Sequence, residues 1–359
     1  MNSTHPKLLE DLEIYDKILP TIDQTITLYG GLKLKELLKI TYFDENMLIR
    51  RRNLLISILE NKKKRNIIIK NLKNINKLEP NIKWLFDENN YTDLHFSSKY
   101  LNTKELVTAK NFLKIYSPSF IVLAYLFMFI ILKYCGCYLS VSDYLMGIYN
   151  SYRFSVSYIL DLLLSNSNLS SLLANMLVTS YIIYQIYIIY NSVDNSIIHF
   201  NKCSEFKCNI YNIKSIISSI KIIYKNDIFL KKEKEMIKPY LDELIKLFDA
   251  DNSIGYKILL KRDYSNYEKS FDKLLQYIGL LDSFISISKL INIGYTFPTF
   301  NFSKENGPYI KAVGLWNPLL NMDQVTNNCL LGNYDNCHEQ NTIILTGPNT
   351  SGKSTYIRN

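Results

Sequence analysis

Residues 342–355 read Thr342-Ile343-Ile344-Leu345-Thr346-Gly347-Pro348-Asn349-Thr350-Ser351-Gly352-Lys353-Ser354-Thr355. Four strand-favouring residues run directly into G-x-x-x-x-G-K-S, the spacing of a phosphate-binding loop between a strand and a helix. Gly347 and Gly352 let the backbone turn its N–H groups toward an anion. Lys353 supplies positive charge for the β- and γ-phosphates, and the Ser354 hydroxyl can ligate Mg²⁺. The stretch therefore predicts a nucleotide site.

The residues between and after the glycines of this loop are more specific than the G-x-x-x-x-G-K-S spacing itself. Residues 346–358 read T-G-P-N-T-S-G-K-S-T-Y-I-R. This closely resembles the P-loop of the MutS family, T-G-P-N-x-x-G-K-S-T-[YF]-[IL]-R. Residues 295–298 and 315–320 look like the family's lead-in to its ATPase domain, although Asn317-Pro318 stands where most members read His-Pro.

The resemblance also reaches the helical parts of the chain. Residues 27–59, which contain Gly30 and Gly31, look like the start of the family's helical core. Residues 274–291, which contain Asp282, resemble the long helix that returns to the ATPase domain. The likeness covers both ends of the chain and weakens in the middle.

The resemblance implies a dimeric, Mg²⁺-dependent ATPase whose helical arms grip a duplex under the control of ATP. We expect ATP and Mg²⁺ as cofactors, with Lys353 on the phosphates and Ser354 on Mg²⁺. The expected nucleotide-binding residues are Gly347, Pro348, Asn349, Thr350, Ser351, Gly352, Lys353, Ser354 and Thr355. Expected partners are duplex DNA, including mismatched DNA, and a second MutS-family subunit in a homodimer. An intracellular location, in the cytoplasm or nucleus, follows from that role.

Four departures from the family pattern qualify this expectation. No mismatch-reading domain precedes the helical core, which begins within about 20 residues of Met1. Val325 stands near the position where the family places an aromatic ring against adenine. The expected DNA clamp falls on two strongly apolar runs. Finally, the chain stops five residues after Ser354, before any acidic Walker B strand. We therefore expect a truncated chain that binds nucleotide but does not hydrolyse it alone. No catalytic residue is assigned, because the family's acidic Walker B residues would follow Asn359.

Composition sets the broad class. Hydrophobic residues make up 47% of the 359 and charged residues 21%, which is a folded composition. Glycine (12) and proline (9) are few, so long helices should dominate. The net charge of +9 permits an anionic partner, either nucleic acid or a membrane surface. Six cysteines match no metal or disulfide framework, and no signal peptide opens the chain, which favours free thiols in a reducing compartment.

These patterns predict a mainly α protein: a MutS-type helical core and lever domain followed by the start of an α/β P-loop ATPase domain. We expect the N-terminal part of the core at 1–95, two hydrophobic helices at 96–195, returning lever and core helices at 196–299, and an incomplete ATPase domain at 300–359. Basic clusters at 50–52 and 62–65 fit a solvated helix face better than a phosphate-contacting surface.

The two apolar runs leave two interpretations open. Residues 115–132 and 162–193 carry no charge, and each is long enough to cross a bilayer as a helix, which takes roughly 20 residues. Lysines flank the pair, at 99, 104, 110 and 114 before the first run and at 202 and 207 after the second. The positive-inside rule then places both termini on the cytoplasmic side of a two-helix hairpin. The alternative is a pair of helices buried at the lever tip of a soluble core.

Overall fold

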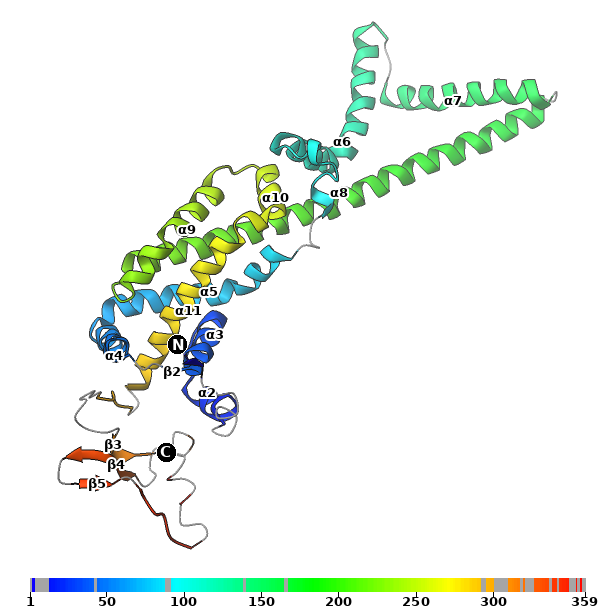
Figure 1. Cartoon of the computed structure of the whole chain (residues 1–359). Helices are drawn as coiled ribbons and strands as arrows, with labels where there is room; N and C mark the ends of the chain where they lie inside the picture. The colour runs from blue at the N-terminus through cyan, green and yellow to red at the C-terminus, as the bar shows by residue number, and fades with distance from the viewer. Residues whose placement is uncertain are drawn as a thin grey trace. The chain divides into compact units, whose positions relative to one another are not determined.

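The chain is mainly α-helical in the computed structural model, as the sequence predicts. The structure describes residues 2–3, 13–41, 44–87, 92–137, 140–164, 167–291, 295–299, 309–316, 319, 326–335, 338–340, 342–348, 353 and 356. It divides into two compact units (Figure 1). Unit 1 comprises Met1–Lys83, Ile213–Leu247 and Ser265–Asn359, and unit 2 comprises Trp84–Asn212 and Phe248–Tyr264.

Long helices account for most of both units. The α-helices are α2 (Leu19–Ile22), α3 (Leu28–Lys39), α4 (Glu45–Glu60), α5 (Lys62–Phe86), α6 (Lys104–Tyr134), α7 (Val141–Leu164), α8 (Ser167–Asn226), α9 (Lys231–Asp249), α10 (Ile254–Arg262) and α11 (Glu268–Ile291). Short π- and 3₁₀-helical turns are η1 (Ile14–Ile18), η2 (Thr92–Leu94), η3 (Lys99–Leu101) and η4 (Tyr264–Asn266). The strands are β1 (Asn2–Ser3), β2 (Ile40–Thr41), β3 (Tyr309–Leu315), β4 (Asn327–Asp335) and β5 (His338–Gln340).

Helical periodicity explains the core of unit 1. In α5, Ile68, Leu72 and Ile75 recur at four- and three-residue spacing, and all three are fully buried. The later half of α8 repeats the pattern with Ile216 and Ile220, also fully buried. The amide of Asn74 bridges the two helices by donating to Ser219 Oγ over 2.8 Å. The helical character expected for residues 1–95 is confirmed in the described ranges.

In unit 1, α3 and α11 pack at very short range, because each contributes a glycine at the crossing. A Cβ on Gly30 would lie 2.2 Å from Asp282 Oδ2, and a Cβ on Gly279 would lie 2.4 Å from the Tyr29 carbonyl oxygen. The gap left by Gly30 lets the buried Asp282 carboxylate reach the start of α3. It accepts hydrogen bonds from Ile26 N (2.9 Å), Thr27 N (2.8 Å) and Thr27 Oγ1 (2.8 Å). A residue 255 positions away thus helps to cap this helix.

The sheet that precedes the nucleotide loop is small and antiparallel, in the order β3-β4-β5. Ala312 pairs with Cys329, and the register shifts beyond it at a bulge that contains Gly314, whose φ is 68°. The strand predicted at 342–345 is wrong: these residues are extended but pair with no strand in the described part of the chain. Within it, the Ile344 side chain is 83% exposed.

Unit 2 holds a compact core at the lower end of α6. Leu94, Val107, Phe206, Ile210 and Ile258 bury their side chains together. Edge-to-face contact between Trp84 and Phe206, with ring centroids 5.5 Å apart, extends this core.

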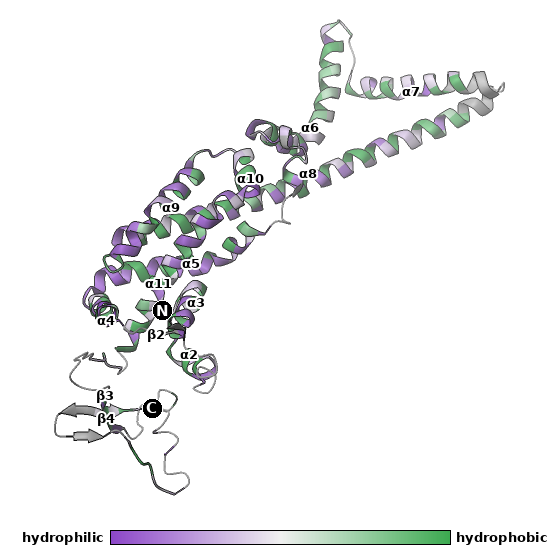
Figure 2. Cartoon of the chain, viewed as in Figure 1, coloured by the Kyte–Doolittle hydropathy of each residue, from purple (hydrophilic) through white to green (hydrophobic). Residues whose placement is uncertain are grey.

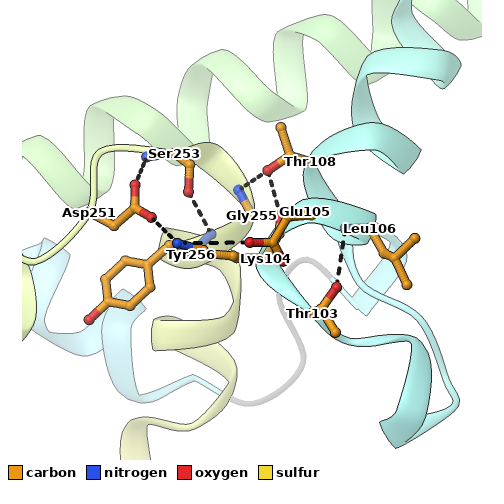
Figure 3. Close-up of polar contacts among 9 residues, drawn as sticks. All are labelled: Thr103, Lys104, Glu105, Leu106, Thr108, Asp251, Ser253, Gly255 and Tyr256. Atoms are coloured by element: carbon orange, nitrogen blue, oxygen red, sulfur yellow. Dashed lines mark hydrogen bonds and ion pairs between the residues drawn. The ribbon is translucent and has the colours of Figure 1, made fainter.

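The start of α10 packs tightly against α6 in the same unit (Figure 3). Gly255 N donates to Thr108 Oγ1 over 3.1 Å, and a Cβ on Gly255 would lie 2.1 Å from the Lys104 carbonyl oxygen. Lys104 Nζ also pairs with Asp251 Oδ2 at 3.2 Å. The loop that enters α10 therefore acts as a capping turn: Asp251 Oδ1 accepts from Ser253 N (2.7 Å), and Ser253 Oγ accepts from Tyr256 N (3.3 Å).

Beyond this core, α6, α7 and α8 extend as largely unburied helices, which we call the apolar arm (residues 115–193). Figure 2 shows hydrophobic residues along all three. Tyrosines join the helices: Tyr144 Oη donates to the Tyr125 carbonyl oxygen over 3.1 Å, and the rings of Tyr152 and Tyr181 lie 5.3 Å apart. Among the described residues, α8 from Leu172 and α11 are long and apolar enough to span a membrane, and α6 qualifies if its two parts, bent by 51°, form one span. Only α11 buries most of its apolar window.

Within the described residues the arm helices are therefore not buried, and both the lever and the membrane interpretations stay predictions. The best apolar window of α8 is 11% buried, and large apolar side chains of α6 point to solvent. Burial requires a facing apolar surface. In α8 it is reached at Ala174 and Val178, whereas most large apolar side chains of the arm remain exposed. An uncovered apolar surface of this size marks a binding or membrane surface.

Candidate functional site

Only part of the predicted nucleotide loop lies within the described residues. These are residues 342–348, Lys353 and Tyr356. The predicted ATP-binding residues Asn349, Thr350, Ser351, Gly352, Ser354 and Thr355 lie outside the described residues, as does Val325. The predicted Mg²⁺ ligand is among them. Over the described part of the chain, no group of three or more His, Cys, Asp or Glu side chains could hold a metal ion.

Lys353 lies back over the start of the loop. Its ammonium donates to the carbonyl oxygens of Gly347 and Pro348, the latter at 2.8 Å. Gly347 has a φ of 152°, a conformation that favours glycine. Lys353 and Tyr356 are both helical, as expected for the turn that follows a P-loop. The ammonium is therefore held beside the loop by carbonyl dipoles, which a phosphate with full negative charge can outcompete.

Tyr356 ties this helical turn to the sheet. Its hydroxyl donates to the Asn328 carbonyl oxygen of β4 over 3.2 Å. The same ring lines a pocket of about 540 Å³ between β3, β4 and the extended segment before the loop, whose wall includes Lys311, Cys329 and Ile343. The loop therefore has a solvent-accessible hollow beside it, with one cationic side chain in its wall.

A second hollow of about 800 Å³ lies between residues 295–299 and β3. Its aromatic wall includes Tyr295 and Trp316, whose rings meet edge to face with centroids 5.2 Å apart. Burial raises the pKa of the Tyr295 hydroxyl. Both residues fall in the segments that resemble an ATPase lead-in. The sequence shows that they are aromatic, but it does not predict that their rings contact each other.

In unit 1, the carboxylates of Glu79 and Asp282 accept hydrogen bonds from backbone N–H groups at the start of α3. Glu79 Oε1 accepts from Leu28 N at 2.9 Å, next to the Asp282 cap. Burial raises the pKa of Asp282, opposed by its hydrogen bonds from Thr27 and Ile26. Burial also raises the pKa of Glu79, and the nearby Asp282 charge raises it further. Both groups face backbone N–H groups rather than a cavity, so they hold the fold together.

The basic clusters of α4 and α5 divide between core and solvent. Arg50 pairs with Glu233 at 3.5 Å, and the Arg51 guanidinium lies 6.0 Å from the centre of the Phe284 ring. Lys62 and Lys63 at the start of α5 are exposed. The arginines therefore serve packing within unit 1, and the lysines fit the predicted solvated face.

At the base of the apolar arm, a pocket of about 870 Å³ opens between α6, α8 and η2. Its charged wall consists of Lys114, Lys202 and Asp93, with the Lys202–Asp93 pair at 3.1 Å. His199 lines it as well, and its Nε2 lies 2.9 Å from Asn111 Oδ1. Burial lowers the pKa of His199, and nearby lysines lower it further. The histidine is therefore neutral at pH 7, which leaves the pocket with one excess positive charge.

Curated proteins similar to this chain carry mismatch-repair names. The chain is 36% identical over 135 residues to the DNA mismatch repair protein MutS of Petrotoga mobilis, which covers 35% of this chain and 15% of that protein. It is 30% identical to the mismatch repair protein MSH3 of Candida glabrata, over 36% of this chain and 13% of that one. The MutS of Staphylococcus aureus is also 30% identical, over 36% and 14%. The chain thus spans about one seventh of the length of these relatives. No family model and no solved structure matches it.

These similarities support a relation to mismatch-repair proteins over about a third of the chain. Sequence reasoning found the arm, but it missed the pocket, because Asp93, Lys114 and Lys202 come from three separate segments. In the sequence, the lysines that flank the two uncharged runs were the feature that indicated a basic site at the base of the arm.

Proposed function

We propose that this chain is a MutS-type ATP-binding protein in which nucleotide at residues 347–355 controls the helical arms. The observation that carries the proposal is the loop itself. It follows the family pattern residue by residue, and the Lys353 ammonium lies over the carbonyl oxygens of Gly347 and Pro348. Similarity to proteins named MutS and MSH3 supports the proposal.

The chemistry of the loop follows from its residues. Backbone N–H groups of the loop and the first turn of the helix donate to phosphate oxygens. Lys353 neutralises charge on the β- and γ-phosphates, and Ser354 Oγ ligates Mg²⁺. Bound Mg²⁺ supplies electrophilic stabilisation of phosphate charge. We place hydrolysis in the dimer, with the acidic strand that the family has after the loop.

Nucleotide binding is tested with Lys353→Ala and a fluorescent ATP analogue in the presence of Mg²⁺. Losing a charge-assisted contact of about 1.5–3 kcal/mol should raise Kd roughly 10- to 150-fold. Lys77→Ala is the matched control, because it removes an equal charge from an exposed site on α5. Equal affinities for wild type and Lys353→Ala would refute the nucleotide site.

The relatives' names suggest duplex DNA as the macromolecular ligand, in a homodimer or with a second subunit of the same type. Charge limits where DNA can bind. Residues 115–193 contain two bases, Lys133 and Arg153, and two acids, Asp143 and Asp161, so the arm carries no net charge. Phosphate contacts require a basic surface. We therefore place any duplex contact on the exposed lysines of α5, outside the arm.

The exposed arm favours a second candidate, a membrane-anchored MutS-like ATPase. Tyr116 and Tyr134 bracket the apolar run of α6, next to Lys114 and Lys133. At 1.5 Å per residue the helical path between the two tyrosines is about 27 Å long, and it would match the roughly 30 Å of a hydrocarbon core only if the two parts of α6, bent by 51° in the structure, straightened into one span. Tyrosine and lysine at both ends of an apolar run are typical of bilayer interfaces. The arm would then form a hairpin with both basal ends on the cytoplasmic side.

Membrane insertion is tested by alkaline carbonate extraction of the tagged chain from expressing cells. Wild type should stay in the membrane pellet. Ile186→Lys should release it, since a lysine at mid-bilayer costs about 2.5–3.5 kcal/mol. Ile222→Lys is the control, because Ile222 is also exposed on α8 but lies outside the arm. A wild-type chain that is soluble after carbonate would refute the anchor and return the arm to a lever role.

A further inference from the structure

The pocket at the base of the apolar arm has polar groups on one side and apolar groups on the other. Lys114 and Ser117 of α6 face Asn191, Ser192 and Lys202 of α8 across it. The remaining wall is apolar or aromatic and consists of Leu113, Tyr184, Tyr187, Ile188 and Ile198. A pocket with this division fits an amphipathic ligand better than a compact polar one.

Asp93 is the one acid in the pocket wall among the described residues, and it faces two lysines, Lys114 and Lys202, so one positive charge is in excess. Lys202 is paired with Asp93, whereas the Lys114 ammonium forms no ion pair or hydrogen bond with the described part of the chain. Lys110, on the same face, donates to the His95 carbonyl oxygen over 2.5 Å, and burial and the charge of Lys114 lower its pKa. One cation is thus available to an external anion, with hydroxyl and amide donors beside it.

The pocket lies at the level where the uncharged runs begin. The Ser196 hydroxyl of α8 donates to the carbonyl oxygen of Ile115, the first residue of the uncharged run in α6. On one side of this level are the lysines and the buried core of unit 2, and on the other is the apolar arm. Tyr184 and Tyr187 are 58% and 59% exposed and continue the pocket wall onto the arm. If the arm spans a bilayer, the pocket opens at the headgroup layer.

We propose that this pocket binds the phosphate headgroup of an anionic phospholipid, with Lys114 on the phosphate and the acyl chains along Tyr184, Tyr187 and Ile188. The assignment rests on the membrane-anchored candidate. Ser117, Asn191 and Ser192 donate to the phosphate or glycerol oxygens, and Lys202 stays partnered by Asp93. Headgroup binding would fix the depth and rotation of the arm in the bilayer, since one lipid contacts both α6 and α8.

The same phosphate chemistry is present in free phosphate and in duplex DNA. The apolar half of the pocket distinguishes the lipid, because a soluble phosphate gains nothing from Leu113 or the two tyrosines. DNA would have to lie against the apolar arm, which offers no row of cations to its backbone.

The test uses the full chain reconstituted in nanodiscs of phosphatidylcholine alone or of an equimolar mixture with phosphatidylglycerol. Native mass spectrometry then counts the phosphatidylglycerol molecules retained on release. Wild type should retain phosphatidylglycerol in preference to phosphatidylcholine, and Lys114→Gln should lower that preference about fivefold, the usual effect of one basic residue at an anionic surface. Lys114→Arg should restore it. Lys207→Gln is the control, because it removes an equal exposed charge from α8 outside the pocket.

Each alternative has its own signature. A chain that resists carbonate but retains both lipids equally would overturn the headgroup site and leave the anchor standing, whereas a carbonate-soluble chain would remove the anchor itself. Equal losses in Lys114→Gln and Lys207→Gln would reduce the effect to general surface charge and overturn the site. Displacement by inorganic phosphate without lipid preference, or salt-sensitive duplex binding lost in Lys114→Gln, would assign the pocket to those ligands instead.

Discussion

The contact between Gly30 and Asp282 makes Gly30→Ala a sharp test of how unit 1 is built. The new Cβ would lie 2.2 Å from Asp282 Oδ2 and 2.8 Å from Asp282 Cγ, far inside van der Waals contact. The carboxylate can move away only by weakening its hydrogen bonds with Ile26 and Thr27. We therefore expect the substitution to loosen the α3–α11 contact, although alanine favours a helix more than glycine does.

The size of the effect follows from three contributions. Overpacking costs about 1–3 kcal/mol, and a buried N–H left unpaired at Thr27 costs about 1–3 kcal/mol more. Alanine returns about 1 kcal/mol through its helix propensity. We expect a net loss of about 2–4 kcal/mol in the free energy of opening of α3. Asp282→Ala removes the two nearest atoms of this clash and leaves only the Cβ of residue 282, at 3.0 Å. Gly30→Ala should therefore cost less in that background, and the two substitutions should be coupled by roughly 1 kcal/mol or more.

Hydrogen-exchange mass spectrometry measures this opening free energy in peptides from α3 and α11, separately from the arm. Gly31→Ala is the control, because its Cβ would meet Asp23 Oδ2 at 3.3 Å, a contact that a small shift relieves. The reasoning fails if Gly30→Ala protects α3 as well as wild type does. It also fails if the effects of Gly30→Ala and Asp282→Ala simply add.

Four further predictions concern helix packing, pH dependence and thiol reactivity. Gly255→Ala should release α10 from α6 by about 1–3 kcal/mol in hydrogen exchange, whereas Gly147→Ala, with no atom within 4 Å of its Cβ, should leave exchange unchanged. As the pH falls from 7 to about 4, the α3–α11 contact should become more stable. The folded state binds protons more tightly than the unfolded chain does, because burial raises the pKa values of Asp282 and Glu79. The α6–α10 junction should weaken only below about pH 4, since hydrogen bonds from Ser253 and Lys104 lower the pKa of Asp251, and Asp251→Asn should abolish that loss. Maleimide should modify exposed Cys135 well before Cys203, whose burial raises its pKa, and equal rates by mass spectrometry would contradict this.

Local patterns made the helices and the apolar arm predictable. Apolar residues at three- and four-residue spacing predicted the helices α3 and α4, and two long uncharged runs predicted the arm. The motif alone placed Lys353, and the structure adds that its ammonium contacts the loop carbonyls. These features depend on neighbours in the sequence, so no knowledge of the tertiary contacts was needed.

Contacts between distant segments were not predictable in the same way. Glu79 looks like any exposed helical acid in the sequence, yet it accepts from Leu28 N at the start of α3. The basal pocket needs three segments to meet. The extended segment at 342–345 shows the opposite failure, because strand-favouring residues form a strand only when a ladder partner is present. Strand propensity is a property of the single residue, whereas strand pairing, helix capping and pocket formation depend on residues far away in the sequence.

The cap that Asp282 provides has a consequence for the order of events during synthesis. The donors at Thr27 leave the ribosome 255 residues before their acceptor does. At about 5–20 residues per second, that delay is roughly 13–50 s. During this interval the start of α3 lacks its partner, while every residue of the apolar arm is translated. If the arm is a membrane anchor, as in the second candidate function, it would be available to a bilayer before unit 1 closes, and insertion would not have to wait for a finished fold.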